Sequence, residues 1–235
     1  MNTNQRTDEF NIVGKLASRY SSKPTIRSLM QLIPFWGVAD TLLQHRADEI
    51  RIDRIRTFFD ELANGTQDLN ETQIQSEDFL HCFFCTLRAA QNTRQRDKIR
   101  LLARLLNSAL TPELDFSTDE YEELLAILDS ITLREFGVLC DLRKFEISTS
   151  QPGEESDLHR ANRHWKKFRI DTIQKYGIQG GEFNAFMAKL ERTGLYLRIT
   201  GGFFDYEGDV GMTTPLLMRL LEFVKIRNTP NIVSE

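Results

Sequence analysis

Apolar residues recur at helical spacing along nearly the whole chain, which predicts a mainly α-helical fold. Pro24 suits the first turn of one helix, and Pro34 should break or kink that helix. Beyond Pro34 a long helix is predicted over 36–62, with Phe58, Phe59 and Leu62 on its apolar side and a densely charged opposite face. The same periodicity predicts further helices over 10–20, 76–90, 94–110, 121–128, 132–145, 157–176, 182–193 and 214–226.

Three helix starts carry a polar cap. Ser76 precedes two acidic residues, which complement the positive end of the helix dipole. Ser117 and Glu120 are three residues apart, as are Thr132 and Glu135. This spacing is the capping box, in which each side chain bonds the backbone N–H of the other residue.

The period changes near the C-terminus. Leu195, Leu197 and Ile199 alternate with polar or amphipathic residues, which predicts a strand that a Gly-Gly turn leads into a small β-hairpin. We therefore expect an N-terminal helical domain, residues 1–115, and a second domain, residues 116–235, in which helices precede the hairpin.

The succession of elements in the second domain resembles a winged helix, the helix-turn-helix variant whose third helix leads into a hairpin wing. Three segments carry the resemblance: Thr132-Leu133-Arg134-Glu135 at the start of the first helix, Leu190 to Leu195 at the end of the third, and Met212-Thr213-Thr214-Pro215 after the wing. The resemblance covers about the last 100 residues of the chain.

A second resemblance spans most of the chain. Ile33-Pro34-Phe35-Trp36-Gly37, then Ser76-Glu77-Asp78-Phe79 and the basic segment Arg94 to Ala109 are similar to bacterial proteins near the abortive-infection alpha family, which is associated with phage defence. The resemblance implies a bacterial host and a defence setting. It implies no chemistry and no catalytic residue.

Composition is that of a globular protein, with 40% hydrophobic and 27% charged residues and a net charge of −4. The three cysteines lie among apolar neighbours, and the polar N-terminus lacks the apolar core of a secretion signal. The longest apolar stretch, 28–43, falls short of a membrane span. We therefore expect a cytoplasmic protein.

No motif points to catalysis, a cofactor or a metal. Cys82 and Cys85 have the spacing of a redox or zinc pair, but Ser76 places them in mid-helix and no second ligand pair follows. His159 and His164 are five apart, which is not a metal spacing, and we expect them on a solvated basic helix. Phosphate-binding and nucleophile motifs are absent from the sequence. The sequence favours a protein that is not an enzyme.

Two helices are locally basic, and a basic stripe is typical of phosphate binding. The candidate nucleic-acid-binding residues are Arg160, Arg163, Lys166, Lys167, Arg169 and Lys175. The alternative, which we favour, is that these cations pair with the acidic run 113–123. The predicted wing carries Asp205, Glu207 and Asp209 without Lys or Arg, which disfavours the usual DNA docking of a winged helix.

The hairpin aromatics Phe203, Phe204 and Tyr206 are the candidate partner-binding residues, because aromatic side chains are enriched at interface hot spots. The alternative is that Phe203 and Phe204 pack against Phe183 and Phe186. For the stretch 29–43, a buried helical hairpin is favoured over contact with a membrane surface.

Three hypotheses follow in order of preference. The first is a non-enzymatic bacterial protein that acts by contact with an unidentified protein partner, in phage defence. The second is a winged-helix DNA- or RNA-binding regulator. The third is a membrane-acting effector. The sequence leaves homo-oligomer formation open.

Overall fold

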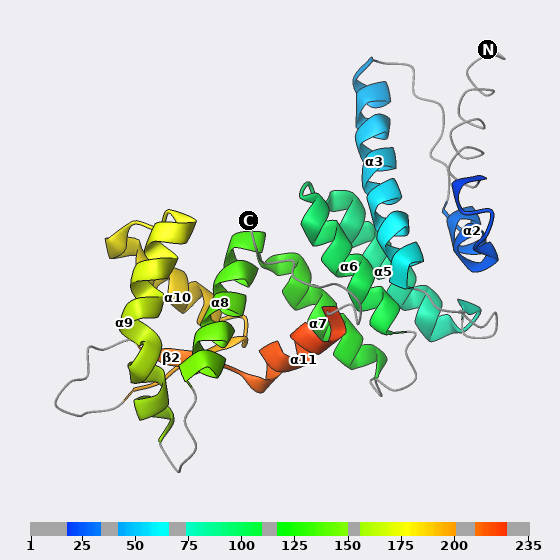
Figure 1. Ribbon diagram of the computed structural model, residues 1–235. Coiled ribbons are helices and arrows are strands. Elements are labelled where there is room, and N and C mark those ends of the chain that lie inside the picture. The colour runs from blue at the N-terminus through cyan, green and yellow to red at the C-terminus, as the bar shows by residue number, and fades with distance from the viewer. Residues whose placement is uncertain are drawn as a thin grey trace. The chain divides into compact units, whose positions relative to one another are not determined.

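The computed structural model describes residues 18–33, 42–65, 74–109, 117–149, 156–200 and 210–224. These residues are mainly helical, with one small two-stranded antiparallel sheet, as predicted (Figure 1). They belong to two compact units. The first unit lies within Met1–Ala126 and Val224–Glu235, and the second is Ile127–Phe223. The division falls inside helix α7 (Thr118–Ser130), and the domain limits 1–115 and 116–235 stay predictions.

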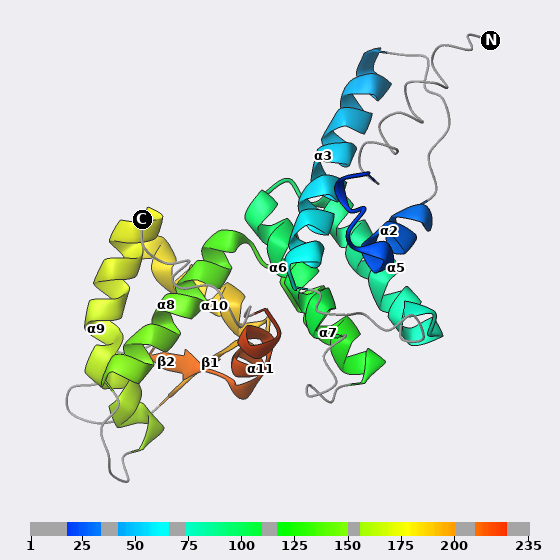
Figure 2. The same cartoon turned by 45° about the vertical axis from the view of Figure 1, so that its right-hand side comes forward.

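The first unit is built on three helices that pack side by side in both views, α3 (Leu42–Gly65), α5 (Glu77–Asn92) and α6 (Arg96–Ser108) (Figures 1 and 2). The shorter α2 (Pro24–Gln31) packs against α3. Phe58, Phe59 and Phe83 are fully buried, and their ring centroids lie 5.5–6.5 Å apart. Aromatic residues of α3 and α5 therefore form the core of this unit.

The predicted caps are confirmed. Ser76 accepts a hydrogen bond from the backbone N–H of Phe79, and Ser117 accepts one from Glu120. The Thr132 box is complete: Glu135 N–H donates to Thr132 Oγ1 over 3.2 Å, and Thr132 N–H donates to Glu135 Oε2 over 2.7 Å. Local sequence thus fixes where α5, α7 and α8 begin.

The second unit pairs α8 (Leu133–Thr149) with α9 (Asp157–Tyr176), and both helices contact strand β2 (Gly211–Thr213). A 3₁₀ turn, Gly180–Glu182, leads into α10 (Phe183–Glu191), which is followed by β1 (Tyr196–Arg198) (Figure 2). After β2 the chain continues into α11 (Pro215–Val224). Phe168 of α9 is fully buried in the core of this unit.

The hairpin packs one face inward. Tyr196 pairs with Thr213 and Leu197 with Met212 across the two strands. Tyr196 is buried and its ring stacks on Trp165 at 6.2 Å, whereas Leu197 is 52% exposed. Gly211 is required beside the Tyr196 ring, because a Cβ at that position would lie 2.2 Å from the tyrosine hydroxyl.

Helix α8 is longer than predicted, because it continues past Phe145 to Thr149. The hydroxyls of Ser148 and Thr149 both donate to the Phe145 carbonyl, over 3.0 and 2.8 Å. This additional turn of helix brings Glu146 and Thr149 to the surface where α8, α9 and β2 meet. The predicted helix over 10–20 and the start of the one over 36–62 lie largely outside the described residues.

Candidate functional site

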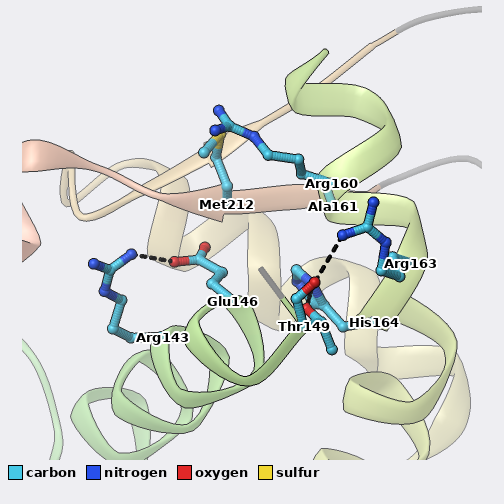
Figure 3. A pocket seen from close by; sticks show the side chains of 8 residues that line it. All are labelled: Arg143, Glu146, Thr149, Arg160, Ala161, Arg163, His164 and Met212. Atoms are coloured by element: carbon cyan, nitrogen blue, oxygen red, sulfur yellow. Dashed lines mark hydrogen bonds and ion pairs between the residues drawn. The ribbon is translucent and has the colours of Figure 1, made fainter. Parts of the chain in front are cut away.

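A pocket of about 120 Å³ opens in the second unit between the end of α8, the first half of α9 and strand β2 (Figure 3). Its lining residues are Arg143, Glu146, Thr149, Arg160, Ala161, Arg163, His164 and Met212. Three of these carry guanidinium groups and one carries a carboxylate. Strong positive charge in a concave site is the arrangement that receives an anion.

Each arginine of the pocket is positioned by a contact within the unit. Arg143 pairs with Glu146 at 3.2 Å, and Arg163 donates to the Thr149 carbonyl over 2.7 Å (Figure 3). Arg160 pairs with Asp157, one turn before it on α9. A guanidinium has five N–H donors, so a contact through one nitrogen leaves an arginine able to bind a ligand as well.

The carboxylate of Glu146 has a structural role. Its Oε1 accepts from the Thr213 backbone N–H over 2.6 Å, and its Oε2 accepts from the Thr213 hydroxyl. These bonds attach strand β2 to helix α8. The carboxylate carries one negative charge, which offsets only part of the charge of the three arginines.

His164 lies at the back of the pocket and is only 3% exposed. Its Nδ1 lies 3.2 Å from Thr149 Oγ1. The Thr149 hydroxyl also lies 2.8 Å from the Phe145 carbonyl, to which it can donate. Nε2 is buried and has no hydrogen-bond partner among the described residues.

Burial lowers the pKa of His164 below its usual value; the Glu146 carboxylate opposes this shift and Arg163 adds to it. The unfolded chain, with a histidine pKa of about 6.5, therefore takes up the proton first as the pH falls. We expect the free energy of unfolding to decrease as the pH drops below ~6.5, and to level off once folded His164 is also protonated.

This dependence can be isolated by urea denaturation of the wild type and His164→Phe from about pH 7.5 to about pH 5. Phenylalanine preserves the ring that lies against Phe145 at 6.4 Å but cannot titrate. The free energy of unfolding of the wild type, relative to that of His164→Phe, should decrease as the pH is lowered. The contributions of titratable groups that both proteins share cancel in this difference. A difference in free energy of unfolding that stays constant over this pH range would contradict the lowered pKa of His164.

Two of the six predicted nucleic-acid-binding residues, Arg160 and Arg163, line the pocket. Three others have contacts within the unit: Lys167 lies over the Phe145 ring, Arg169 over the Phe183 ring, and Lys175 pairs with Asp141 at 2.7 Å. Lys166, the sixth, is exposed. The role of the six cations in binding nucleic acid stays a prediction.

Sequence reasoning missed Arg143, Glu146, Thr149 and Met212, which come to the pocket from α8 and β2. It was wrong about His164, which is buried and not on a solvated face. One signal was available: His164 is adjacent to Trp165 and four residues before Phe168, on the apolar side of the helix.

The predicted partner-binding residues Phe203, Phe204 and Tyr206 lie outside the described residues. Their alternative packing partner Phe183 is buried against Trp165 and Phe168. In the stretch 29–43, Leu29, Met30 and Ile33 are buried, and residues 34–41 lie outside the described part. None of the helices in the described ranges has both the length and the apolarity to span a bilayer.

A second polar cluster, in the first unit, does not form a catalytic relay. Cys85 Sγ lies 3.7 Å from His81 Nε2, and the same nitrogen contacts the Glu122 carboxylate. In a nucleophile–His–acid triad the two partners engage opposite nitrogens of the ring. Burial raises the pKa of the neighbouring Cys82 to about 11, which leaves it an unreactive thiol at neutral pH. In the described part of the chain, no group of three or more potential ligands could hold a metal ion.

Comparison of the chain with protein-family models, with curated proteins and with solved structures found no significant match.

Proposed function

We propose that this chain is a non-enzymatic regulatory protein that binds a partner protein, and that the pocket of the second unit receives an anionic group of that partner. The observation that carries the proposal is that Arg143, Arg160 and Arg163 all line one pocket. Arginine binds carboxylates and phosphates through paired N–H donors, which fixes the orientation of the bound group.

An apolar contact next to the pocket supports a protein as the partner. Leu197 is half exposed, and its cross-strand neighbour Met212 lines the pocket. A partner segment that places an anionic side chain in the pocket can therefore cover Leu197 with an apolar residue. Such pairing of an apolar anchor with a charged one is common at protein interfaces.

The second unit is proposed to be a winged helix, since α8, α9 and α10 precede β1 and β2 in the order that this fold requires. In DNA-binding members the third helix enters the major groove. Here the charges of α10 have partners within the unit: Lys189 pairs with Glu135, and Glu191 with Arg198. This favours a protein partner over DNA. The bacterial phage-defence setting and the cytoplasmic location remain proposals that rest on the sequence.

The proposal is tested by fluorescence anisotropy with labelled peptides that carry phosphoserine, glutamate or neither, and with duplex DNA, single-stranded DNA and RNA at low and near-physiological salt. We expect an anionic peptide to bind, and Arg160→Ala combined with Arg163→Ala to weaken binding by about tenfold or more. Arg192→Ala is the matched control, because Arg192 is an exposed arginine of the same unit outside the pocket.

Three results would contradict the proposal. The first is that no anionic peptide binds, and the second is that anionic peptides bind the double arginine variant as tightly as the wild type. The third is that DNA or RNA binds in a salt-sensitive way and that charge reversal at Lys166 and Lys167 abolishes this binding. That result would favour the nucleic-acid-binding regulator.

A further inference from the structure

His164 is a titratable side chain in the wall of the arginine pocket. The arginines of the pocket keep their charge at all physiological pH values, whereas a histidine changes its charge near neutrality. The His164 ring is 3% exposed and lies 3.2 Å from Thr149 Oγ1, so the packing of α9 against the end of α8 holds it in this wall (Figure 3). A change of pH near neutrality therefore alters the charge of the pocket through this ring.

The charged groups around His164 set its protonation state. Burial disfavours the charged form and lowers the pKa of the ring; Glu146 of α8 opposes this shift, and Arg163 of α9 adds to it. The other charged groups that line the pocket or lie over the neighbouring Phe145 ring are cations: Arg143, Arg160 and Lys167. Strand β2 contributes Met212, which carries no charge. At neutral pH the ring is therefore mostly neutral.

An anion in the pocket acts on the same equilibrium. The pocket has a volume of about 120 Å³, so an anionic group bound there lies within a few ångströms of the ring that forms part of its wall. An opposite charge within about 4–6 Å favours the charged form of a titratable group, and no hydrogen bond between the two is needed. A bound anion therefore raises the pKa of His164, whichever ring nitrogen carries the proton in the neutral form.

We propose that His164 couples this site to pH, so that binding of the partner's anionic group takes up a proton and acidification tightens the complex. This inference rests on the proposed function, whose binding site it makes pH-dependent. Coupling is reciprocal: if the anion favours protonated His164, then protonated His164 favours the anion. The affinity should rise over the pH range in which His164 is protonated in the complex but not in the free protein. It should level off once the free protein is protonated as well.

Nuclear magnetic resonance of the wild-type full chain tests the coupling without a change in the site. The ring C–H signals of the 4 histidines are followed from about pH 8 to about pH 5, with and without saturating sulfate, which keeps its charge over this range. The signal that is absent from His164→Phe belongs to His164, and its pKa should be higher with sulfate. His159 is the internal control, because it is exposed on the same helix outside the pocket and its pKa should change less.

Isothermal titration calorimetry measures the consequence for affinity. Between about pH 7.5 and about pH 5, the dissociation constant of sulfate should fall by about threefold or more for the wild type relative to His164→Phe. The glutamate peptide should show the same trend. At the upper end of this range the ring is neutral, so the wild type and His164→Phe should bind sulfate about equally, which confirms that the variant retains the site.

The inference is overturned if bound sulfate leaves the pKa of His164 unchanged or lowers it, or if the wild type and His164→Phe show the same pH dependence of binding. Failure of the proposed function gives a different result. In that case neither sulfate nor the glutamate peptide binds in a way that responds to Arg160→Ala combined with Arg163→Ala. Binding that this double variant abolishes, without an effect on the pKa of His164, would refute the pH coupling alone and leave the anion site intact.

Discussion

Arg104→Ala is expected to lower the free energy of unfolding of the first unit by about 3–5 kcal/mol. Arg104 of α6 donates to Glu61 of α3 over 2.7 Å, and the two side chains are only 14% and 9% exposed. Removing the arginine leaves the Glu61 carboxylate buried beside apolar neighbours without its counter-ion. The cost is the desolvation of an unpaired charge, which exceeds the net value of the pair itself.

Arg100→Ala is the matched control, because Arg100 lies one turn away on the same helix and pairs with Asp97 where both side chains are 45% or more exposed. An exposed pair contributes about 0–1 kcal/mol, so this variant should unfold nearly as the wild type does. Replacing both members of the buried pair, as Glu61→Leu with Arg104→Met, should cost much less than Arg104→Ala. The free energy of unfolding of all three variants is measured by urea denaturation, with circular dichroism as the signal. Equal losses for Arg104→Ala and Arg100→Ala would show that the burial of the pair has no energetic consequence.

Local features of the fold could be predicted from the sequence. The Thr132–Glu135 box lies within four consecutive residues, so its hydrogen bonds depend on little else in the chain. For the same reason α9 has the predicted bounds: Ser156 caps its start, and Gly177 ends it with φ +59°. Short-range rules suffice where both partners are close in sequence.

Pairings between residues distant in sequence depend on how the helices pack. The prediction that the basic helices pair with the acidic run 113–123 stays a prediction, because part of that run lies outside the described residues. Ion pairs that the described residues do show join Arg96 to Asp53, Arg104 to Glu61 and Lys175 to Asp141, on helices that pack against them. Charge patterns along a sequence show that a helix face is polar, but only the packing of helices determines which opposite charge it meets.

Apolar alternation likewise identified the strand but not the face that it buries. Leu197 shares the alternation with Leu195, yet Leu197 points outward and Tyr196 packs inward on Trp165. The larger aromatic surface of Tyr196 favours its burial, and Gly211 provides the space for its ring. Hydropathy alone ranks leucine above tyrosine, so it does not predict this orientation.

The pocket could not be predicted from the sequence because no segment of it is a motif. Its residues span positions 143 to 212 and lie on two helices and a strand. Arg160 and Arg163 were identified through local basic charge, but as part of a stripe for nucleic acid. His164 was expected on a solvated face, but it is buried. Long-range packing converts part of a basic helix into a pocket for a single anionic group.

Phe168→Ala is expected to destabilise the second unit by about 3–5 kcal/mol, the usual cost of removing a fully buried phenylalanine. Phe168 has no exposed surface, and its ring lies 5.3 Å from that of Trp165, 5.9 Å from Phe145 and 6.2 Å from Phe183. These neighbours come from α8, α9 and α10, so the cavity would loosen the contacts that hold the helices together. Arg160 and Arg163 are on the same helix as Phe168, and binding of the anionic peptide should weaken as well.

Tryptophan fluorescence during urea denaturation measures this effect, in a Trp36→Phe background so that only Trp165 reports. Ile170→Ala is the control, because Ile170 lies two residues along the same helix and is 55% exposed. Ile170→Ala should change the free energy of unfolding by no more than about 0.5 kcal/mol. Similar midpoints for Phe168→Ala and Ile170→Ala would contradict the packing of α8, α9 and α10 around Phe168. A large loss of stability in Phe168→Ala together with unchanged binding of the anionic peptide would show instead that the pocket forms without that core.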